Sequence, residues 1–303
     1  MDKDETQIEQ IYEFMQEYAI RAGEILMSYR GKVVNKPKDA SRSAGADQEE
    51  GGLALTVVDE IIQEGFLWEL SRFNFSPNIR INCEEETTLR ELFRENKGEL
   101  CTVHQDPCDG TKPYLDGKND FATGYGISDP QNNFTHTVIY APARDKLYVA
   151  SPDSDFVFNK NEEDLETTVT QSKPNYKRIF SKRVLNERGK QEAKKAELSV
   201  EDIESTHCRI IDVALGNAGA CLYGKSNPHD SFVPYAFAKA RETLLFDING
   251  RPINGQNIVV NYKNGFPVFE RVPSVVYINA ENPHKDVIMN ILSDTRNLDE
   301  TVL

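Results

Sequence analysis

The residues of this chain most suited to chemistry lie in one short stretch, 106–112, which reads Asp-Pro-Cys-Asp-Gly-Thr-Lys. Asp106 and Asp109 stand three residues apart, and the proline between them fixes one backbone angle. Gly110 permits a tight turn, and Thr111 is suited to cap a helix start, where free N–H groups attract anions. An apolar run before the stretch predicts a strand. A strand that ends in acids and leads into a helix start can hold hard cations beside a phosphate. The alternative is an ordinary Asp-rich turn.

A second group of carboxylates, Glu84-Glu85-Glu86, follows the short apolar run 79–83. On its own, a run of three Glu is typical of a solvated helix start. Both acidic groups, however, stand at the end of an expected strand. If the two strands are neighbours that end at the same edge of a sheet, their carboxylates meet. We therefore expect the two groups to form one site.

The chain before these strands predicts two helices that pack against them. Apolar residues recur at three- and four-residue steps over 5–30, and a second helix is expected over about 56–73, with Asp59 in its first turn. The polar segment between the two helices, 31–52, is predicted to be a loop of the kind that forms a lid in enzymes.

The chain after the acidic stretch predicts a meander followed by alternating helices and strands. The predicted strands are 121–127, 135–140, 146–150, 243–246, 257–262 and 274–280, and the predicted helices lie within 184–204, 230–240 and 283–292. The polar segment 151–180 is interpreted as the boundary between two lobes.

Composition limits the class of protein. The chain has 303 residues, 39% of them hydrophobic, which is enough for two lobes, expected at 1–155 and 156–303. A formal charge of −14 argues against a nucleic-acid polymer as partner, and an anionic substrate would need metal ions at its site. No apolar run reaches the length of a membrane span, and the acidic N-terminus does not resemble a signal peptide. Five cysteines without metal-site spacing predict reduced thiols in a cytoplasmic protein.

The ordered set of motifs resembles the inositol monophosphatase superfamily of metal-dependent phosphatases. That superfamily includes the 3′(2′),5′-bisphosphate nucleotidases and the fructose-1,6-bisphosphatases. Its signature Asp-Pro-Ile/Leu-Asp-Gly-Thr is similar to 106–111, and its Gly-Glu-Glu motif is similar to 84–86. Further pieces follow the order of the family and span nearly the whole chain: Ala22-Gly23-Glu24-Ile25-Leu26, Thr56-Val57-Val58-Asp59, Val213-Ala214-Leu215-Gly216-Asn217-Ala218, His229-Asp230 in place of Trp-Asp, and Asp247-Ile248-Asn249-Gly250-Arg251-Pro252.

The resemblance implies a fold and a reaction. The fold is α+β, a layered α-β-α-β-α sandwich of the inositol monophosphatase/fructose-1,6-bisphosphatase type. The N-terminal lobe would carry most metal ligands, and the C-terminal lobe would carry Asp230. The implied reaction is Mg²⁺-dependent hydrolysis of a phosphate monoester by in-line attack of a metal-activated water. Two or three Mg²⁺ ions, with Mn²⁺ as a substitute, and sensitivity to lithium are also implied.

The resemblance assigns metal ligands residue by residue. Asp106 would bridge two ions, the Cys108 carbonyl would complete one site, and Asp109 and Asp230 would hold the second ion. A Glu of the 84–86 run would hold the first ion. One alignment of that run points to Glu85 and another points to the residue before it, and we select Glu85.

The resemblance also assigns catalytic and phosphate-binding roles. Thr111 would orient the attacking water, supported by a hydrogen bond to Asp59. The amides of Gly110 and Thr111 would bind phosphate at the helix start. Lys112 would contact substrate, or it would simply face water.

Several positions depart from the pattern of the family. Cys108 replaces Ile or Leu, as an inert buried thiol or as an oxidation-sensitive one. His229 replaces Trp, Gly219 stands where many relatives have Asp, and 239–242 replaces Glu-Ala-Gly-Gly. These departures cluster where the substrate alcohol binds in the family.

The substrate is therefore less determined than the reaction. Lys112 after Gly-Thr is more similar to the bisphosphate nucleotidase branch, which favours hydrolysis of 3′-phosphoadenosine 5′-phosphate to AMP. Inositol or another sugar-alcohol phosphate and histidinol phosphate are the alternatives. A catalytically silent homologue that binds phosphate or metal for regulation is the competing hypothesis. The family contains both monomers and homodimers.

Overall fold

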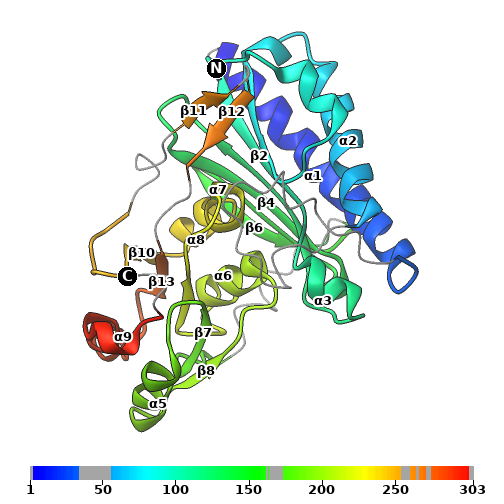
Figure 1. Cartoon of the computed structure of the whole chain (residues 1–303). Helices are drawn as coiled ribbons and strands as arrows, with labels where there is room; N and C mark the ends of the chain where they lie inside the picture. Colours follow the sequence, from blue (N-terminus) through cyan, green and yellow to red (C-terminus); the bar gives the residue numbers. More distant parts are fainter. Residues whose placement is uncertain are drawn as a thin grey trace.

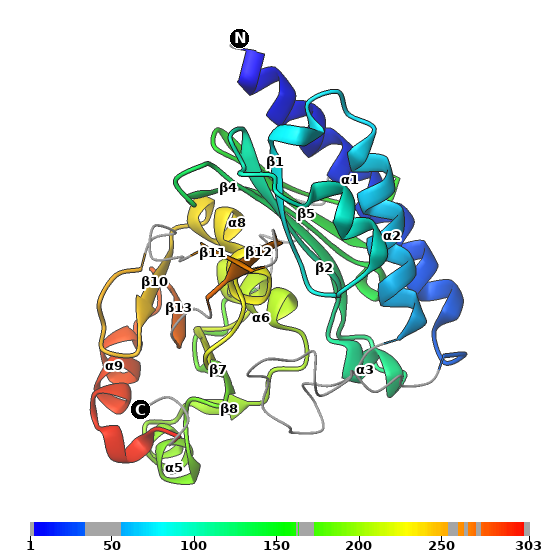
Figure 2. The same ribbon diagram turned by 45° about the horizontal axis from the view of Figure 1, so that its top comes forward.

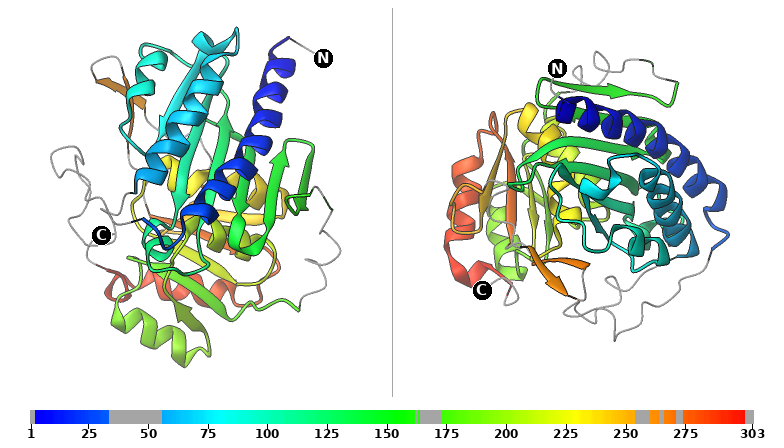
Figure 3. Two further views of the ribbon diagram at one scale, coloured as in Figure 1. Left: turned by 90° about the vertical axis from the view of Figure 1, so that its right-hand side faces the viewer. Right: turned by 90° about the horizontal axis from the view of Figure 1, so that it is seen from above.

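The computed structural model describes residues 3–33, 56–161, 163, 173–253, 260–263, 266–270 and 274–299. Most of the loop expected at 31–52 lies outside these residues. Within them, helices and sheets alternate in the order α-β-α-β-α, so the predicted α+β sandwich is confirmed (Figures 1 and 3). No helix in the described ranges combines the length and apolar character needed to cross a membrane.

The first sheet has six strands in chain order, β1-β2-β3-β4-β5-β6. Their bounds are Ile79–Cys83, Cys101–Asp109, Ala122–Ser128, Phe134–Ala141, Lys146–Ser151 and Ser154–Phe158. β1 and β2 are parallel, and all later neighbours are antiparallel. Cys83 pairs with Gln105, so both strands run into their acidic residues at the same edge. This pairing confirms the expectation that the two acidic groups meet.

β2 is longer than the apolar run that predicted it, because it continues through the acidic motif to Asp109. The register against β3 shifts between Asp106 and Asp109. Pro107 lies inside this irregularity, where its missing N–H costs no regular ladder hydrogen bond. The bulge lets the two Asp residues stand close together without continuing the regular alternation of the strand.

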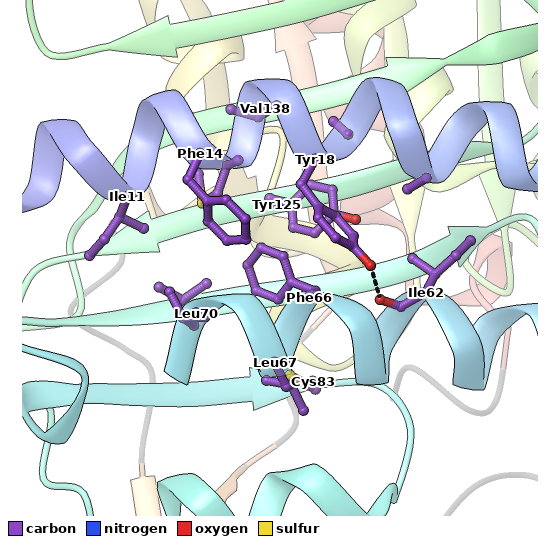
Figure 4. Packing of buried hydrophobic residues seen from close by; sticks show 14 of the residues in the cluster. Ile11, Phe14, Tyr18, Ile62, Phe66, Leu67, Leu70, Cys83, Tyr125 and Val138 are labelled. Atoms are coloured by element: carbon purple, nitrogen blue, oxygen red, sulfur yellow. Dashed lines mark hydrogen bonds between the residues drawn. The ribbon is translucent and has the colours of Figure 1, made fainter. Parts of the chain in front are cut away.

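The outer face of the first sheet is covered by α1 (Lys3–Tyr29) and α2 (Val57–Ser71), as Figure 2 shows. Phe66 of α2 stacks on Phe14 of α1 at a ring distance of 5.2 Å and contacts Tyr125 of β3 at 4.8 Å. The buried Tyr18 hydroxyl donates to the Ile62 carbonyl at 2.9 Å (Figure 4). This packing fixes α2 on the sheet and thereby fixes the position of its N-terminus, where Asp59 lies.

The middle layer consists of α6 (Thr206–Ala214), α7 (Pro228–Phe232) and α8 (Tyr235–Ala240). The sequence predicted one helix over 230–240. The structure divides it into α7 and α8, because Pro234 has no N–H to continue the first helix and instead caps the second. The short α7 sits beside β2, and its residues therefore reach the acidic edge of the first sheet.

The second sheet has five strands in the order β10-β13-β9-β7-β8. Their bounds are Thr243–Asp247, Val275–Asn279, Ala220–Tyr223, Arg178–Lys182 and Ser199–Glu201. Alternate residues face opposite layers: Val275 and Tyr277 join the core between the sheets, and Val276 and Ile278 join the core under α5 (Glu187–Lys195) and α9 (Lys285–Ser293).

Short elements complete the described chain. A hairpin of β11 (Val260–Lys263) and β12 (Phe266–Phe269) lies beside β1. The remaining short helices are α3 (Thr111–Leu115), η1 (Ser76–Asn78), η2 (Thr88–Phe93), η3 (Pro142–Arg144) and η5 (Thr295–Asn297). β6 pairs with β5 and spans the boundary expected after 155. We therefore propose that the lobes divide between β6 and β7.

Candidate metal centre and active site

The N-terminus of α2 presents Asp59 in a fixed orientation. Thr56 caps the helix by accepting hydrogen bonds from the backbone N–H groups of Val58 and Asp59, at 3.1 and 3.4 Å. The Thr56 N–H and hydroxyl both donate to Asp59 Oδ2. The other oxygen, Oδ1, accepts a hydrogen bond from the Thr111 hydroxyl at 3.4 Å. The capping box thus holds the fully buried Asp59 with one oxygen turned toward Thr111.

Asp106 lies at the centre of the acidic group. It is 2% exposed, and burial raises the pKa of its carboxyl well above the ordinary range. The charges of Glu84, Asp109 and Asp230 raise this pKa further, and the Glu84 carboxyl forms a hydrogen bond with Asp106. Four acids therefore converge, one just after β1, two from β2 and one from α7, and each repels the others when ionised.

The geometry favours a different glutamate as metal ligand from the one selected from the sequence. The main chain of Glu85 is clamped by Gln63 of α2: Glu85 N–H donates to Oε1 at 2.9 Å, and Nε2 donates to the Glu85 carbonyl at 2.6 Å. The side chain that contacts Asp106 by a hydrogen bond is that of Glu84. We therefore propose Glu84 in place of the Glu85 selected from sequence.

Asp109 joins β2 to the middle layer. Its Oδ2 accepts hydrogen bonds from the Ser205 hydroxyl and from the N–H of His207, the latter at 2.8 Å. Its Oδ1 accepts one from the N–H of Thr206 at 3.1 Å. An ionised carboxylate can accept about four hydrogen bonds or ligand contacts, so one position on Oδ1 remains for a cation. Asp109 thus fixes the start of α6 beside the acidic edge.

Asp230 approaches from α7. Its Oδ2 accepts a hydrogen bond from the Asn227 N–H at 3.0 Å, which orients the side chain within the first turn. Its Oδ1 lies 3.9 Å from Nε2 of the buried His229. The side chain is about one-fifth exposed, at 22%, so this acid borders the site from its open side.

The turn after Asp106 positions backbone groups. The Cys108 N–H donates to Asp106 Oδ1 at 3.1 Å, and the Cys108 carbonyl accepts a hydrogen bond from the Thr111 hydroxyl at 2.9 Å. Burial raises the pKa of the Cys108 thiol well above its ordinary value, which supports the inert alternative. Gly110 has a φ of +90°, and a Cβ there would lie 2.8 Å from the Asp120 carbonyl, so only glycine fits this turn.

Lys112 occupies the second residue of α3 and is exposed. Its side chain has no hydrogen-bond or ion-pair partner among the residues that the structure describes, so its charge is available to an anion in solution.

One residue of the site was not selected from the sequence. His207, in the first turn of α6, is fully buried, and its Nε2 donates to the His229 carbonyl at 2.9 Å. One of its ring nitrogens and one carboxylate oxygen each from Asp106 and Asp109 all lie within 4.8 Å of one another. Local sequence gives no signal for this contact, because it depends on the docking of α6 against β2.

The donor set fits a divalent metal ion. Hard cations prefer carboxylate and carbonyl oxygens, and this edge supplies the Glu84 carboxylate just after β1, carboxylates from β2 and α7, and the Cys108 carbonyl. A cation would also remove the mutual repulsion that raises the pKa of Asp106.

Solved structures of inositol monophosphatases share this fold. An inositol monophosphatase of Thermotoga maritima has a TM-score of 0.69 at 16% identity, covering 94% of this chain and 97% of its own. An inositol monophosphatase/NADP phosphatase solved with Mg²⁺ and phosphate has a TM-score of 0.73 at 17% identity, covering 97% and 99%. A staphylococcal inositol monophosphatase in a lithium inhibitory complex has a TM-score of 0.70 at 16% identity, covering 99% of each chain. No curated protein sequence matches the chain.

The layered fold therefore places the chain in the structural class of these inositol monophosphatases. Residues 7–285 match the model of the inositol monophosphatase family. The chain belongs to this family, and it is a metal-dependent hydrolase of phosphoric monoesters.

Proposed function

We propose that the acidic edge built around Asp106 is the metal centre and active site of a small-molecule phosphomonoesterase. The observation that carries this proposal is the convergence of Glu84, Asp109 and Asp230 on one buried carboxyl. Buried acids gathered close together are costly unless a cation neutralises their charge. We assign Glu84, Asp106, Asp109, Asp230 and the Cys108 carbonyl to the ions. Two Mg²⁺ ions with a third, loosely held one are proposed, and Mn²⁺ can replace them.

The Thr111–Asp59 pair is proposed to hold the attacking water. Thr111 has one hydroxyl proton, which it can donate to Asp59 Oδ1 or to the Cys108 carbonyl. When it donates to Asp59, its lone pair is left to accept a hydrogen bond from water and aim the oxygen lone pair of that water at phosphorus. Bound metal ions would supply activation of the water and neutralisation of the phosphoryl charge. Asp59 cannot rotate away, because Thr56 holds its other oxygen.

The substrate we propose is a phosphate ester of a secondary ring hydroxyl, with 3′-phosphoadenosine 5′-phosphate as the leading hypothesis. Related folds are described as acting on or binding NADP and D-inositol-1-phosphate. The scissile phosphates of NADP, inositol phosphate and the bisphosphate nucleotide all sit on a secondary hydroxyl of a ring. Exposed Lys112, at the start of α3, supports the nucleotide because it can meet a second phosphate. An inositol or other sugar-alcohol phosphate is the alternative.

A phosphate-release assay tests this function. The purified protein is given 3′-phosphoadenosine 5′-phosphate, NADP, D-inositol-1-phosphate and histidinol phosphate, each with Mg²⁺, with Mn²⁺ and with EDTA. We expect release that requires the divalent ion and is reduced by millimolar LiCl. Absence of release from every substrate, together with normal divalent-ion binding, would support the silent regulatory homologue instead.

A further inference from the structure

The buried imidazole of His207 is a metal-binding group near Asp106 that the proposed ligand set leaves unused. His207 belongs to α6, whose first turn is held against β2 by Asp109. The His207 backbone N–H itself donates to Asp109 Oδ2 at 2.8 Å. The same carboxylate that is proposed to bind metal therefore also fixes the residue that carries the imidazole.

The hydrogen bonds of His207 define its tautomer. Its Nε2 lies 2.9 Å from the His229 carbonyl oxygen, and a carbonyl oxygen can only accept. Nε2 must therefore carry a proton, and in the neutral ring Nδ1 carries a lone pair. Nδ1 is buried without a hydrogen-bond partner among the described residues. Metal-binding histidines commonly show this arrangement, in which one ring nitrogen donates to a carbonyl and the other is left for the ion.

The ring of His207 packs against β3 beside Asp106. Gly124 of β3 is the register partner of Asp106. A Cβ at Gly124 would lie only 2.4 Å from both Nδ1 and Cε1 of His207, so the ring occupies the space that the glycine leaves open. The ligand atoms of His207, Asp106 and Asp109 lie within 4.8 Å of one another. These distances between ligand atoms are close to the roughly 4 Å that separates opposite ligands of an ion with bonds of about 2.1 Å.

We propose that His207 Nδ1 is a ligand of the divalent ion held by Asp106 and Asp109, and that this site prefers a transition-metal ion such as Mn²⁺ over Mg²⁺. The inference rests on the metal centre proposed above. An all-oxygen site suits Mg²⁺, whereas an imidazole nitrogen added to carboxylates shifts preference toward first-row transition metals. Metal binding by the imidazole also uses a buried nitrogen to which the described residues offer no hydrogen bond, and a buried polar atom without a partner is costly.

Mn²⁺ spectroscopy tests the inference without turnover. One equivalent of MnCl₂ is added to the purified protein, and electron spin-echo spectroscopy detects nitrogen nuclei bound to the ion. We expect nitrogen modulation in the wild type and in His284→Ala, a histidine at the start of the distant α9. We expect its loss in His207→Ala and in His207→Asn, which places an amide where Nδ1 stands.

Calorimetry provides the second readout. In His207→Ala, affinity for Mn²⁺ should fall by about tenfold or more, whereas affinity for Mg²⁺ should change less. Circular dichroism verifies that each variant is folded, and the Asn variant serves if the Ala variant is not. Wild-type Mn²⁺ bound without nitrogen modulation, or modulation that persists in His207→Asn, would overturn the histidine assignment while leaving the phosphatase proposal intact. A wild type that binds neither ion would overturn both.

Discussion

Glu84 follows β1, Asp106 lies within the neighbouring parallel strand β2, and their carboxyls share a hydrogen bond. Such a bond requires one proton between two acids, and it exists because burial and mutual repulsion make double ionisation unfavourable. A divalent cation satisfies the same pair without the proton. The relationship between these two residues is therefore the structural basis for a metal centre at this edge.

The first prediction separates Glu84 from its neighbour. Glu84→Gln should weaken divalent-ion binding by about tenfold or more and reduce turnover with it, because it removes a charge that touches Asp106. Glu85→Gln is the matched control and should change ion binding less, since Gln63 contacts the main chain of Glu85. Isothermal titration with MgCl₂ and MnCl₂ measures both. A larger loss in the Glu85 variant would return the ligand assignment to that residue.

The second prediction concerns the water-orienting hydroxyl. Thr111→Val keeps the shape of the side chain but removes the group that lies between Asp59 and the Cys108 carbonyl. Steady-state kinetics should show kcat lower by roughly 100-fold or more, with KM little changed, because the lost interaction acts on the attacking water. Thr111→Ser should keep most of the activity. Equal turnover by the Val variant and the wild type would refute this role.

The third prediction concerns the contact between the layers. Arg144 donates to Asp120 at 2.8 Å and to Asp212 of α6 at 3.0 Å, and Arg209 contacts the same two acids. These side chains are mostly buried, so Arg144→Met should lower the free energy of unfolding by about 3 kcal/mol, because it leaves buried charges poorly compensated. Urea unfolding measures the change.

An exposed ion pair provides the control for that experiment. Lys118 pairs with Glu204 at the surface, with about half of the lysine side chain exposed. Lys118→Met should leave the urea midpoint nearly unchanged, because solvent screens such a pair. If the two variants lose the same free energy of unfolding, the buried ion pairs of Arg144 do not stabilise the fold more than an exposed pair does.

The fourth prediction is a pH dependence of stability from His136. Burial lowers the pKa of its imidazole to about 4, from an ordinary value near 6.5. The unfolded chain therefore binds a proton first as pH falls, and stability is lost between about pH 6.5 and 4. Between pH 7.5 and 5, this group should account for about 2 kcal/mol of the loss. In His136→Gln, the free energy of unfolding from urea titration should fall by that much less between pH 7.5 and 5. An equal fall in the variant and the wild type would contradict the prediction.

The local parts of the site could be predicted from sequence. The strand at 79–83 and the capped helix with Asp59 in its first turn were both evident, because alternation and capping depend on near neighbours. The meeting of the two acidic groups also followed, since it needed only that consecutive strands be parallel neighbours. The order of the motifs along the chain then indicated the family, and the family implied the reaction, which no single motif could do.

The rest depended on contacts that local sequence does not encode. Whether Glu84 or Glu85 faces Asp106 depends on how the chain leaves β1 beside its neighbour. The approach of His207 to Asp109 joins residues far apart in the chain and requires α6 to dock against β2. β6 was not assigned as a strand, because its five residues lie within a mostly polar segment and, among the described strands, it pairs only with β5 at the edge of the sheet.

The most direct test of the metal-dependent phosphatase site is phosphate release by Asp106→Asn, measured beside the wild type with Mg²⁺ and with Mn²⁺. Asparagine keeps the size of the side chain and removes the charge on which Glu84, Asp109 and Asp230 converge. We predict that the wild type releases phosphate only with a divalent ion and that the folded variant releases none. Turnover by the variant near that of the wild type would contradict the account.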